Sequence, residues 1–275
     1  MTTRKSNVCM TMGLCDMAQI KTQTDAAGVA VVTLCNPAKR NAMTLGMWQA
    51  LAQTMKALSE DQAVRVVVLR GEGQAAFASG ADISEFDQVR SRPEDVAFYD
   101  ACVEQAETAV GVCTKPVIAA ISGACYGGGV GIAASCDLRY VDATARFSVP
   151  AGKLGLGYAL TDIKRMHRLM GAAAATELLL TARVYDGEAA VNAGMAHACV
   201  QDVFAHALAQ AEHVASLAPL TLASIKMALQ HLDDMPGAPD VAAVEAAVQA
   251  CFDSEDYAEG RRAFAQKRAP KFMGR

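Results

Sequence analysis

The chain has 275 residues, of which 52% are hydrophobic and 20% charged, a composition typical of a soluble globular enzyme. Its formal net charge of −4 provides no electrostatic basis for binding nucleic acid, and no apolar run is long enough to span a membrane. The nine cysteines include no CxxC pair, so we expect reduced thiols rather than disulfides or a zinc site. These features predict a cytoplasmic protein with no metal ion and with neither a nucleic-acid nor a membrane partner.

The first 17 residues differ from the rest of the chain. They are too polar for a secretory signal, and they contain three further methionines that could serve as the true start: Met10, Met12 and Met17. We therefore expect residues 1–17 to be a disordered extension.

Strand and helix patterns alternate through the first two thirds of the chain, and helices fill the last third. The predicted strands are 29–34, 65–71, 115–123 and a pair within 138–150. The predicted helices begin with 44–60, which has Thr44 as its N-cap, and 93–113. From about Asp162 onward the signal is helical, including 172–181, 187–194, 203–217, 220–232, 240–252 and 255–267. This order predicts an α/β fold with a core over 18–200 and a helical C-terminal region over 201–275.

Two glycine-containing turns follow the two most apolar strands, GEGQAAFASGADI over 71–83 and GACYGGGVGIAAS over 123–135. Ligands bind beyond the carboxyl ends of parallel strands, and turns without side chains offer backbone N–H groups. Two such groups that converge on one oxygen form an oxyanion hole. Three alternatives are a packing role for the glycines, a dinucleotide site at Gly71-x-Gly73-x-x-Ala76, and a phosphate-binding loop. The dinucleotide site lacks a following helix, and the phosphate-binding loop lacks the GK[ST] sequence.

The chain resembles the enoyl-CoA hydratase/isomerase (crotonase) superfamily, from about residue 18 to the end, in four motifs: NPAKRNAM, GEGQAAFASGADISEF, KPVIAAISGACYGGGVGIAASCDLRY and DSEDYAEGRRAFAQKRAPKF. The resemblance implies a spiral of ββα units with a helical C-terminal trimerisation region, assembled as a homotrimer or a hexamer. It also implies an acyl-CoA substrate, with CoA as part of the substrate and no separate cofactor. The backbone N–H groups of Ala81 and Gly128 match the two oxyanion donors of the family.

The resemblance further implies contacts with CoA. The adenosine end of CoA is expected near Ala38 and Arg40 and along the segment that contains Ala78, Asp82 and Ile83, in which Asp82 also fixes the loop. In the C-terminal helix, Phe264 and Lys267 match positions that reach the CoA of a neighbouring subunit, although simple helix packing also accounts for Phe264.

The acid/base residues depart from the family pattern. Hydratases of this family use two glutamates, at positions that here are Gly131 and Ala151. Neither residue can transfer a proton. Of the nearby acids, Asp162 is interpreted as a helix cap and Glu85 as a surface residue.

Tyr158, thirty residues after Gly128, is similar in position to a tyrosine that orients the substrate carboxylate in the methylmalonyl-CoA decarboxylases of this family. Loss of CO₂ creates an enolate without a base, so a site without carboxylates favours decarboxylation of a malonyl-type CoA. Those enzymes carry His at the position of Ala81, which leaves the substrate open. The alternatives are a hydratase or isomerase with a non-standard acid/base and a non-catalytic acyl-CoA-binding protein; a dehydrogenase is a remote third.

Overall fold

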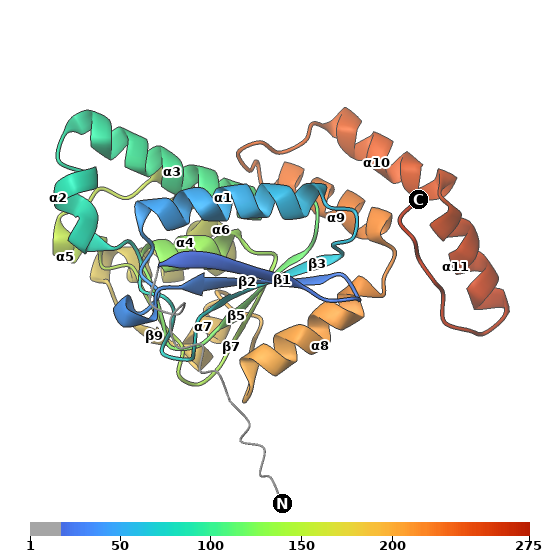
Figure 1. Ribbon diagram of the computed structural model, residues 1–275, viewed down its shortest axis with the longest axis horizontal. Coiled ribbons are helices and arrows are strands. Elements are labelled where there is room, and N and C mark those ends of the chain that lie inside the picture. The colour runs from blue at the N-terminus through green and yellow to red at the C-terminus, as the bar shows by residue number, and fades with distance from the viewer. Residues whose placement is uncertain (1–17) are drawn as a thin grey trace, which may run out of the picture.

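Continuous apolar runs form the middle of a six-stranded sheet in the computed structural model, which describes residues 18–275 (Figure 1). The expected extension over 1–17 lies outside the described residues. In spatial order the strands are β1 (Gln19–Thr24), β2 (Val29–Cys35), β3 (Val66–Gly71), β5 (Val117–Ile121), β7 (Leu138–Val141) and β10 (Ala198–Cys199). All neighbours are parallel except β1, which pairs antiparallel with β2.

A second sheet consists of four short strands. Its order is β4 (Ala76–Ala78), β6 (Ala124–Tyr126), β8 (Arg146–Ser148) and β9 (Tyr185–Asp186). The first three are parallel, and β9 is antiparallel to β8. Strands β3, β5 and β7 are each followed by one of these short strands, which gives the repeated ββα units predicted for the fold.

The helices agree with the predicted segments to within a few residues, and α6 also covers the stretch between Asp162 and residue 172 where the signal is helical. Helix α1 begins after Thr44, whose hydroxyl accepts a hydrogen bond from Met47 N–H as the N-cap prediction requires. The longer helices are α1 (Leu45–Glu60), α3 (Pro93–Gly111), α4 (Gly128–Ser135), α6 (Leu160–Thr181), α8 (Val203–Ala215), α9 (Pro219–Leu232), α10 (Val241–Asp253) and α11 (Glu255–Ala265). The short ones are η1 (Pro37–Lys39), η2 (Ile83–Glu85), α2 (Phe86–Val89), α5 (Ala151–Leu154) and α7 (Gly187–Asn192).

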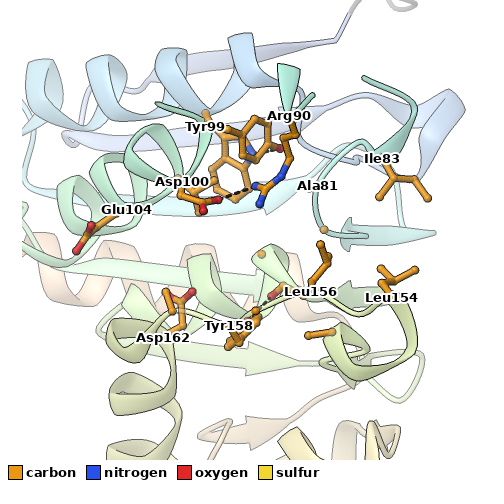
Figure 2. A pocket seen from close by; sticks show the side chains of 18 of the residues that line it. Ala81, Ile83, Arg90, Tyr99, Asp100, Glu104, Leu154, Leu156, Tyr158 and Asp162 are labelled. Carbon is orange, nitrogen blue, oxygen red and sulfur yellow. Dashed lines mark hydrogen bonds and ion pairs between the residues drawn. The ribbon is translucent and has the colours of Figure 1, made fainter. Parts of the chain in front are cut away.

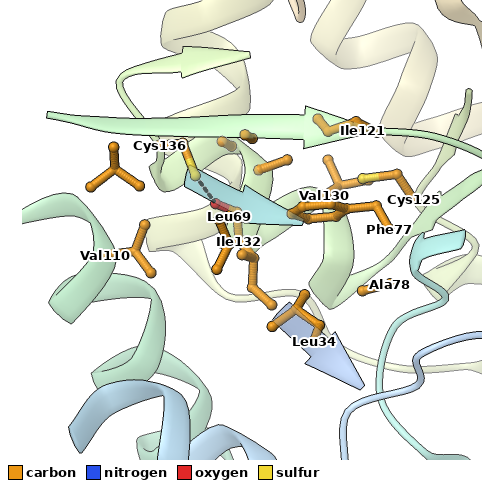
Figure 3. Packing of buried hydrophobic residues seen from close by; sticks show 14 of the residues in the cluster. Leu34, Leu69, Phe77, Ala78, Val110, Ile121, Cys125, Val130, Ile132 and Cys136 are labelled. Carbon is orange, nitrogen blue, oxygen red and sulfur yellow. Dashed lines mark hydrogen bonds between the residues drawn. The ribbon is translucent and has the colours of Figure 1, made fainter. Parts of the chain in front are cut away.

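Both faces of the large sheet are buried, which explains why its inner strands are apolar throughout. In β3, Val67 and Leu69 belong to the main core, which also contains residues of α1, α3 and α4 (Figure 3). Val66 and Val68 point to the opposite face and pack against α8. Helix α8 therefore packs with the core although it follows the predicted boundary at residue 200.

Helices α10 and α11 extend to one side of the sheet (Figure 1). Their exposed side chains include several large apolar residues: Val241, Val248, Phe252, Tyr257 and Phe264. A role for this region in trimerisation stays a prediction.

Five strands were not predicted, because two of them have only two residues, two lie inside the glycine turns, and β1 is a polar edge strand. Helix α6 begins at Leu160, close to Asp162, where the predicted helical signal starts, and it is interrupted at Gly171, where φ is 71°. The seven cysteines of the described range are all unpaired, and five of them are buried. No helix within residues 18–275 is long and apolar enough to cross a membrane.

Candidate active site

Two turns at the carboxyl ends of β4 and β6 form the centre of the candidate site. Because β4 and β6 are parallel neighbours, with Ala78 paired to Cys125, both turns emerge at the same edge of the small sheet. A Cβ atom on Gly80 would lie only 3.0 Å from Tyr126 O and 3.8 Å from Gly128 N. The two turns are therefore in direct contact.

The three consecutive glycines after β6 are explained by backbone conformation and close packing. Gly127 has φ 49° and ψ −116°, a conformation that L-residues adopt only with strain. A Cβ on Gly128 would lie 2.9 Å from the Trp48 ring, and one on Gly129 would overlap the carbonyl oxygen of Ala78. The absence of side chains lets α4 begin directly against α1 and β4.

The N–H groups of Ala81 and Gly128 in these turns find no acceptor within residues 18–275. Gly128 is the first residue of α4, where N–H groups have no partner within the helix. Ala81 forms a bridge with Met43, but the bonds of that bridge use Gly80 O and Asp82 N. Among the hydrogen bonds of residues 18–275, none is donated by the N–H of Ala81 or of Gly128. Both residues line one cavity, so the structure brings the two predicted oxyanion donors together.

The cavity has a volume of about 560 Å³ and a mostly apolar wall, which suits a small ligand or an acyl group. Its larger apolar and aromatic side chains are Trp48, Phe86, Tyr99, Leu154, Leu156 and Tyr158. In Figure 2, Tyr99 and Arg90 lie on one side of the cavity, and Tyr158 and Asp162 lie on the other.

Tyr158 lies beside the turn that follows β6. Its hydroxyl donates a hydrogen bond to the carbonyl oxygen of Gly127 at 3.4 Å. Burial, followed by the nearby carboxylates of Asp162 and Glu107, raises the pKa of Tyr158 well above its ordinary value. The phenol is therefore neutral at physiological pH and acts as a hydrogen-bond donor.

The cavity also contains a buried group of two carboxylates and one guanidinium. Arg165 Nη1 lies 2.6 Å from Glu107 Oε2 and 2.8 Å from Asp162 Oδ1. Glu107 and Arg165 are only 1% and 5% exposed, and both Glu107 and Asp162 line the cavity. Burial, together with the neighbouring Asp162, raises the pKa of Glu107 well above its usual range and outweighs Arg165. The expectation of a site without carboxylates is therefore wrong.

Sequence reasoning missed this group for two reasons. Glu107 lies on the buried face of α3 together with Tyr99, Ala106 and Val110, and a carboxylate among apolar residues of a predicted helix is the one local indication of a functional group. The position of Asp162 predicts a helix cap, but Asp162 is the third residue of α6 and its carboxylate binds Arg165 instead.

Glu85 is also placed differently from the prediction. It is half-buried, and its Oε2 accepts a hydrogen bond from Leu45 N–H at 3.0 Å, so it stabilises the N-terminus of α1 rather than standing free on the surface.

Most residues predicted to contact CoA cluster near the two turns. Ser79 N–H donates to the carbonyl oxygen of Arg40, which joins the exposed turn containing Ala38 and Arg40 to the end of β4. Ile83 is 60% exposed and lines the cavity, whereas Ala78 is fully buried in the core.

Asp82 is buried and fixes the loop, as predicted. Its carboxylate accepts hydrogen bonds from Ser84 N–H and from Lys39 Nζ, the latter at 2.7 Å. Burial raises the pKa of Asp82, but the hydrogen bonds from Lys39 and Ser84 outweigh it, so the pKa lies below the ordinary value.

Phe264 and Lys267 lie apart from this cluster. Phe264 is 89% exposed on α11, Lys267 is also exposed, and neither residue lines the cavity. Contact between these two side chains and the CoA of a neighbouring subunit stays a prediction.

Comparisons with known proteins show which family the chain resembles. The family model described as enoyl-CoA hydratase/isomerase matches residues 24–275. The chain is 30% identical over 258 residues to the mouse enoyl-CoA hydratase domain-containing protein 2, mitochondrial, covering 90% of this chain and 85% of that protein. It is 29% identical to the short-chain-enoyl-CoA hydratase of Clostridium acetobutylicum, with coverages of 87% and 92%. A crystal structure of an enoyl-CoA hydratase/carnithine racemase from Magnetospirillum magneticum superposes with a TM-score of 0.87 at 37% identity, covering 93% and 96% of the two chains.

Proposed function

Because the chain belongs to the enoyl-CoA hydratase/isomerase family, we propose that it stabilises the enolate of an acyl-CoA thioester at the backbone N–H groups of Ala81 and Gly128. The observation that supports this role is the pair of unbonded donors, contributed by two touching turns to one cavity. Such donors are most effective when they are already oriented toward the position where charge develops. The pairing of β4 with β6 fixes both turns before substrate binds.

Hydration or isomerisation of an enoyl-CoA is the reaction that this cavity supports best. Both reactions require proton transfer by a group within reach of the substrate. Glu107 and Asp162 supply carboxyl groups beside the oxyanion turns, which removes the argument for decarboxylation that rested on their absence. The relatives named above as hydratases support the same choice.

Decarboxylation of a malonyl-type CoA is the second candidate, and Tyr158 is the observation in its favour. Its neutral hydroxyl lies at the oxyanion turn and could hold a substrate carboxylate in position.

The assembly and the CoA site belong to the same proposal. Large apolar side chains remain exposed on α9, among them Ile225, Leu229 and Leu232. Together with those of α10 and α11, they support a homotrimer or hexamer in which Phe264 and Lys267 reach the CoA of the next subunit. Ala38, Arg40 and Ile83 would lie along the CoA of the same subunit.

A mass-spectrometric panel tests the reaction. The purified protein is incubated with crotonyl-CoA, methylmalonyl-CoA and a β-ketoacyl-CoA, and the products are identified by mass and, where a product has the same mass as its substrate, by chromatographic retention time. Gain of water on crotonyl-CoA is the expected result, and loss of CO₂ from methylmalonyl-CoA would support the second candidate instead. Binding of these thioesters without conversion of any would identify a non-catalytic acyl-CoA-binding protein and contradict the proposal.

A further inference from the structure

The space beside Gly131 is occupied by a carboxylate from another helix. Gly131 lies in the second turn of α4, where α4 packs against α3. A Cβ atom on Gly131 would lie 2.8 Å from Glu107 Cδ and would overlap Glu107 Oε1. The carboxylate of Glu107 and a side chain at position 131 therefore cannot occupy this site together. The glycine at 131 and the glutamate at 107 form a matched pair.

The charges of the buried group favour one retained proton. Glu107 and Asp162 share a single guanidinium, that of Arg165, so two ionised carboxylates would leave one excess negative charge out of water. One proton on the pair makes the group neutral, in agreement with the raised pKa of Glu107. Three of its polar atoms have no hydrogen-bond partner among the described residues: Glu107 Oε1, Arg165 Nε and Arg165 Nη2.

This group borders the same cavity as the oxyanion donors. Asp162 projects into the cavity from the side that also carries Tyr158 (Figure 2), and its side chain is 12% exposed. Glu107 contributes to the wall from α3, although very little of its surface reaches solvent. A carboxylic acid and a carboxylate thus stand beside the cavity that Ala81 and Gly128 line.

We propose that the Glu107–Asp162 pair, held by Arg165, is the proton-transfer group of this site and takes the place of the side chain absent at Gly131. This inference rests on the proposed function. In hydration of an enoyl-CoA, the ionised member of the pair removes a proton from water as the water oxygen bonds to C3. The C2–C3 π electrons then form the enolate at Ala81 and Gly128. The protonated member gives its proton to C2 as the enolate collapses, so the pair ends with one proton, as it began.

Isosteric variants test the assignment. Glu107→Gln and Asp162→Asn are expected to lower kcat for crotonyl-CoA hydration at least about 100-fold, while KM changes little. The same variants should lose exchange of the C2 hydrogens of butyryl-CoA with D₂O, a readout that a merely structural ion pair would leave in place. Glu94→Gln, a surface carboxylate on the same helix, is the matched control and should behave like the unmodified protein.

A double variant distinguishes loss of the carboxylate from misfolding of the single variants. Glu107→Ala removes the carboxylate and frees the space beside Gly131. The double variant Glu107→Ala/Gly131→Glu is therefore expected to be at least about tenfold more active than Glu107→Ala. Hydration and exchange that survive Glu107→Gln would overturn the assignment and leave the proposed function intact. Failure of the unmodified protein to convert any acyl-CoA would overturn the proposed function and this inference with it.

Discussion

Trp48 Nε1 donates a hydrogen bond to the hydroxyl of Tyr99 at 3.0 Å, with both rings almost completely buried. The bond joins α1 to α3 behind the oxyanion turn, since the Trp48 ring lies against Gly128. Burial raises the pKa of Tyr99 to about 12, so the phenol stays neutral and available as an acceptor.

Tyr99→Phe is expected to destabilise the protein, because it leaves the buried Trp48 N–H without a partner. The expected loss in the free energy of unfolding is about 1–3 kcal/mol, measured by urea denaturation. Tyr257→Phe, at a tyrosine that is 46% exposed, is the control and should change the free energy by less than about 0.5 kcal/mol. Equal stability of the two variants would contradict a structural role for the Trp48–Tyr99 bond.

Gly127→Ala should impair both folding and turnover. The conformation at Gly127 strains any L-residue, at a cost of about 1–3 kcal/mol, and the strain is relieved only by moving the turn that carries Gly128 N–H. Conversion of acyl-CoA is expected to fall at least about 100-fold, as for loss of one oxyanion donor. Gly152→Ala is the matched control, since a Cβ there meets no atom within 4 Å. Full activity in Gly127→Ala would show that this turn does not position a donor.

Gly131→Ala is expected to lower stability by about 1–3 kcal/mol, the usual cost of overpacking, because its methyl group overlaps the Glu107 carboxylate. In a Glu107→Ala background the same substitution should cost much less. A double-mutant cycle by chemical denaturation measures this coupling. Additive effects would mean that the two residues do not share one space.

Tyr158→Phe separates the two candidate reactions. If the hydroxyl holds a substrate carboxylate, its loss should lower turnover of methylmalonyl-CoA about 10- to 100-fold, the equivalent of one hydrogen bond to a charged group. Hydration of crotonyl-CoA, which has no such carboxylate, should change less than about twofold. Tyr126→Phe, at a tyrosine outside the lining of the cavity, controls for loss of a hydroxyl near the turn. Unchanged turnover of both substrates would remove Tyr158 from the mechanism.

The pH dependence of stability should report the proton on Glu107. Its pKa is raised in the folded protein above the ordinary 4.5, so the folded state binds this proton more tightly than the unfolded state. The resulting stabilisation is complete below the unfolded pKa and is lost as the pH rises through the folded pKa. Urea denaturation above pH 4.5 should therefore show a decline in stability for the unmodified protein that is absent in Glu107→Gln. Parallel curves would contradict a proton retained on Glu107.

The pattern of apolar residues and glycines along the sequence was sufficient to predict most of the fold and the two turns of the site. Apolar runs such as 65–71 and the helical spacing of 44–60 reflect burial of one face or both, a property that the residues themselves record. The glycines after β6 likewise indicated a close approach of main chain. The apolar periodicity and the glycine cluster each lie within a short segment, so the sequence alone is enough to detect them.

The buried group of Glu107, Asp162 and Arg165 was not predictable in this way, because it depends on contacts between distant segments. Glu107 meets Arg165 across 58 residues of sequence, and nothing in the neighbourhood of either residue indicates the other. Asp162 occupies the first turn of a helix, where an acidic residue has an ordinary explanation in the helix dipole. Packing of α4 against both α3 and α6 brings these residues into one group.

The groups proposed to bind oxygen and those proposed to move protons are encoded in different ways. The groups proposed to bind oxygen belong to the main chain of two turns. Substitution at Ala81 or within α4 can therefore leave them in place as long as the backbone conformation is unchanged. The groups proposed to move protons belong to side chains on helices that converge on one cavity. A carboxylate can therefore come from one helix where the neighbouring helix has a glycine. An alignment that inspects only position 131 would describe this chain as having lost its acid, although the same volume holds a carboxyl group that arrives from the opposite helix.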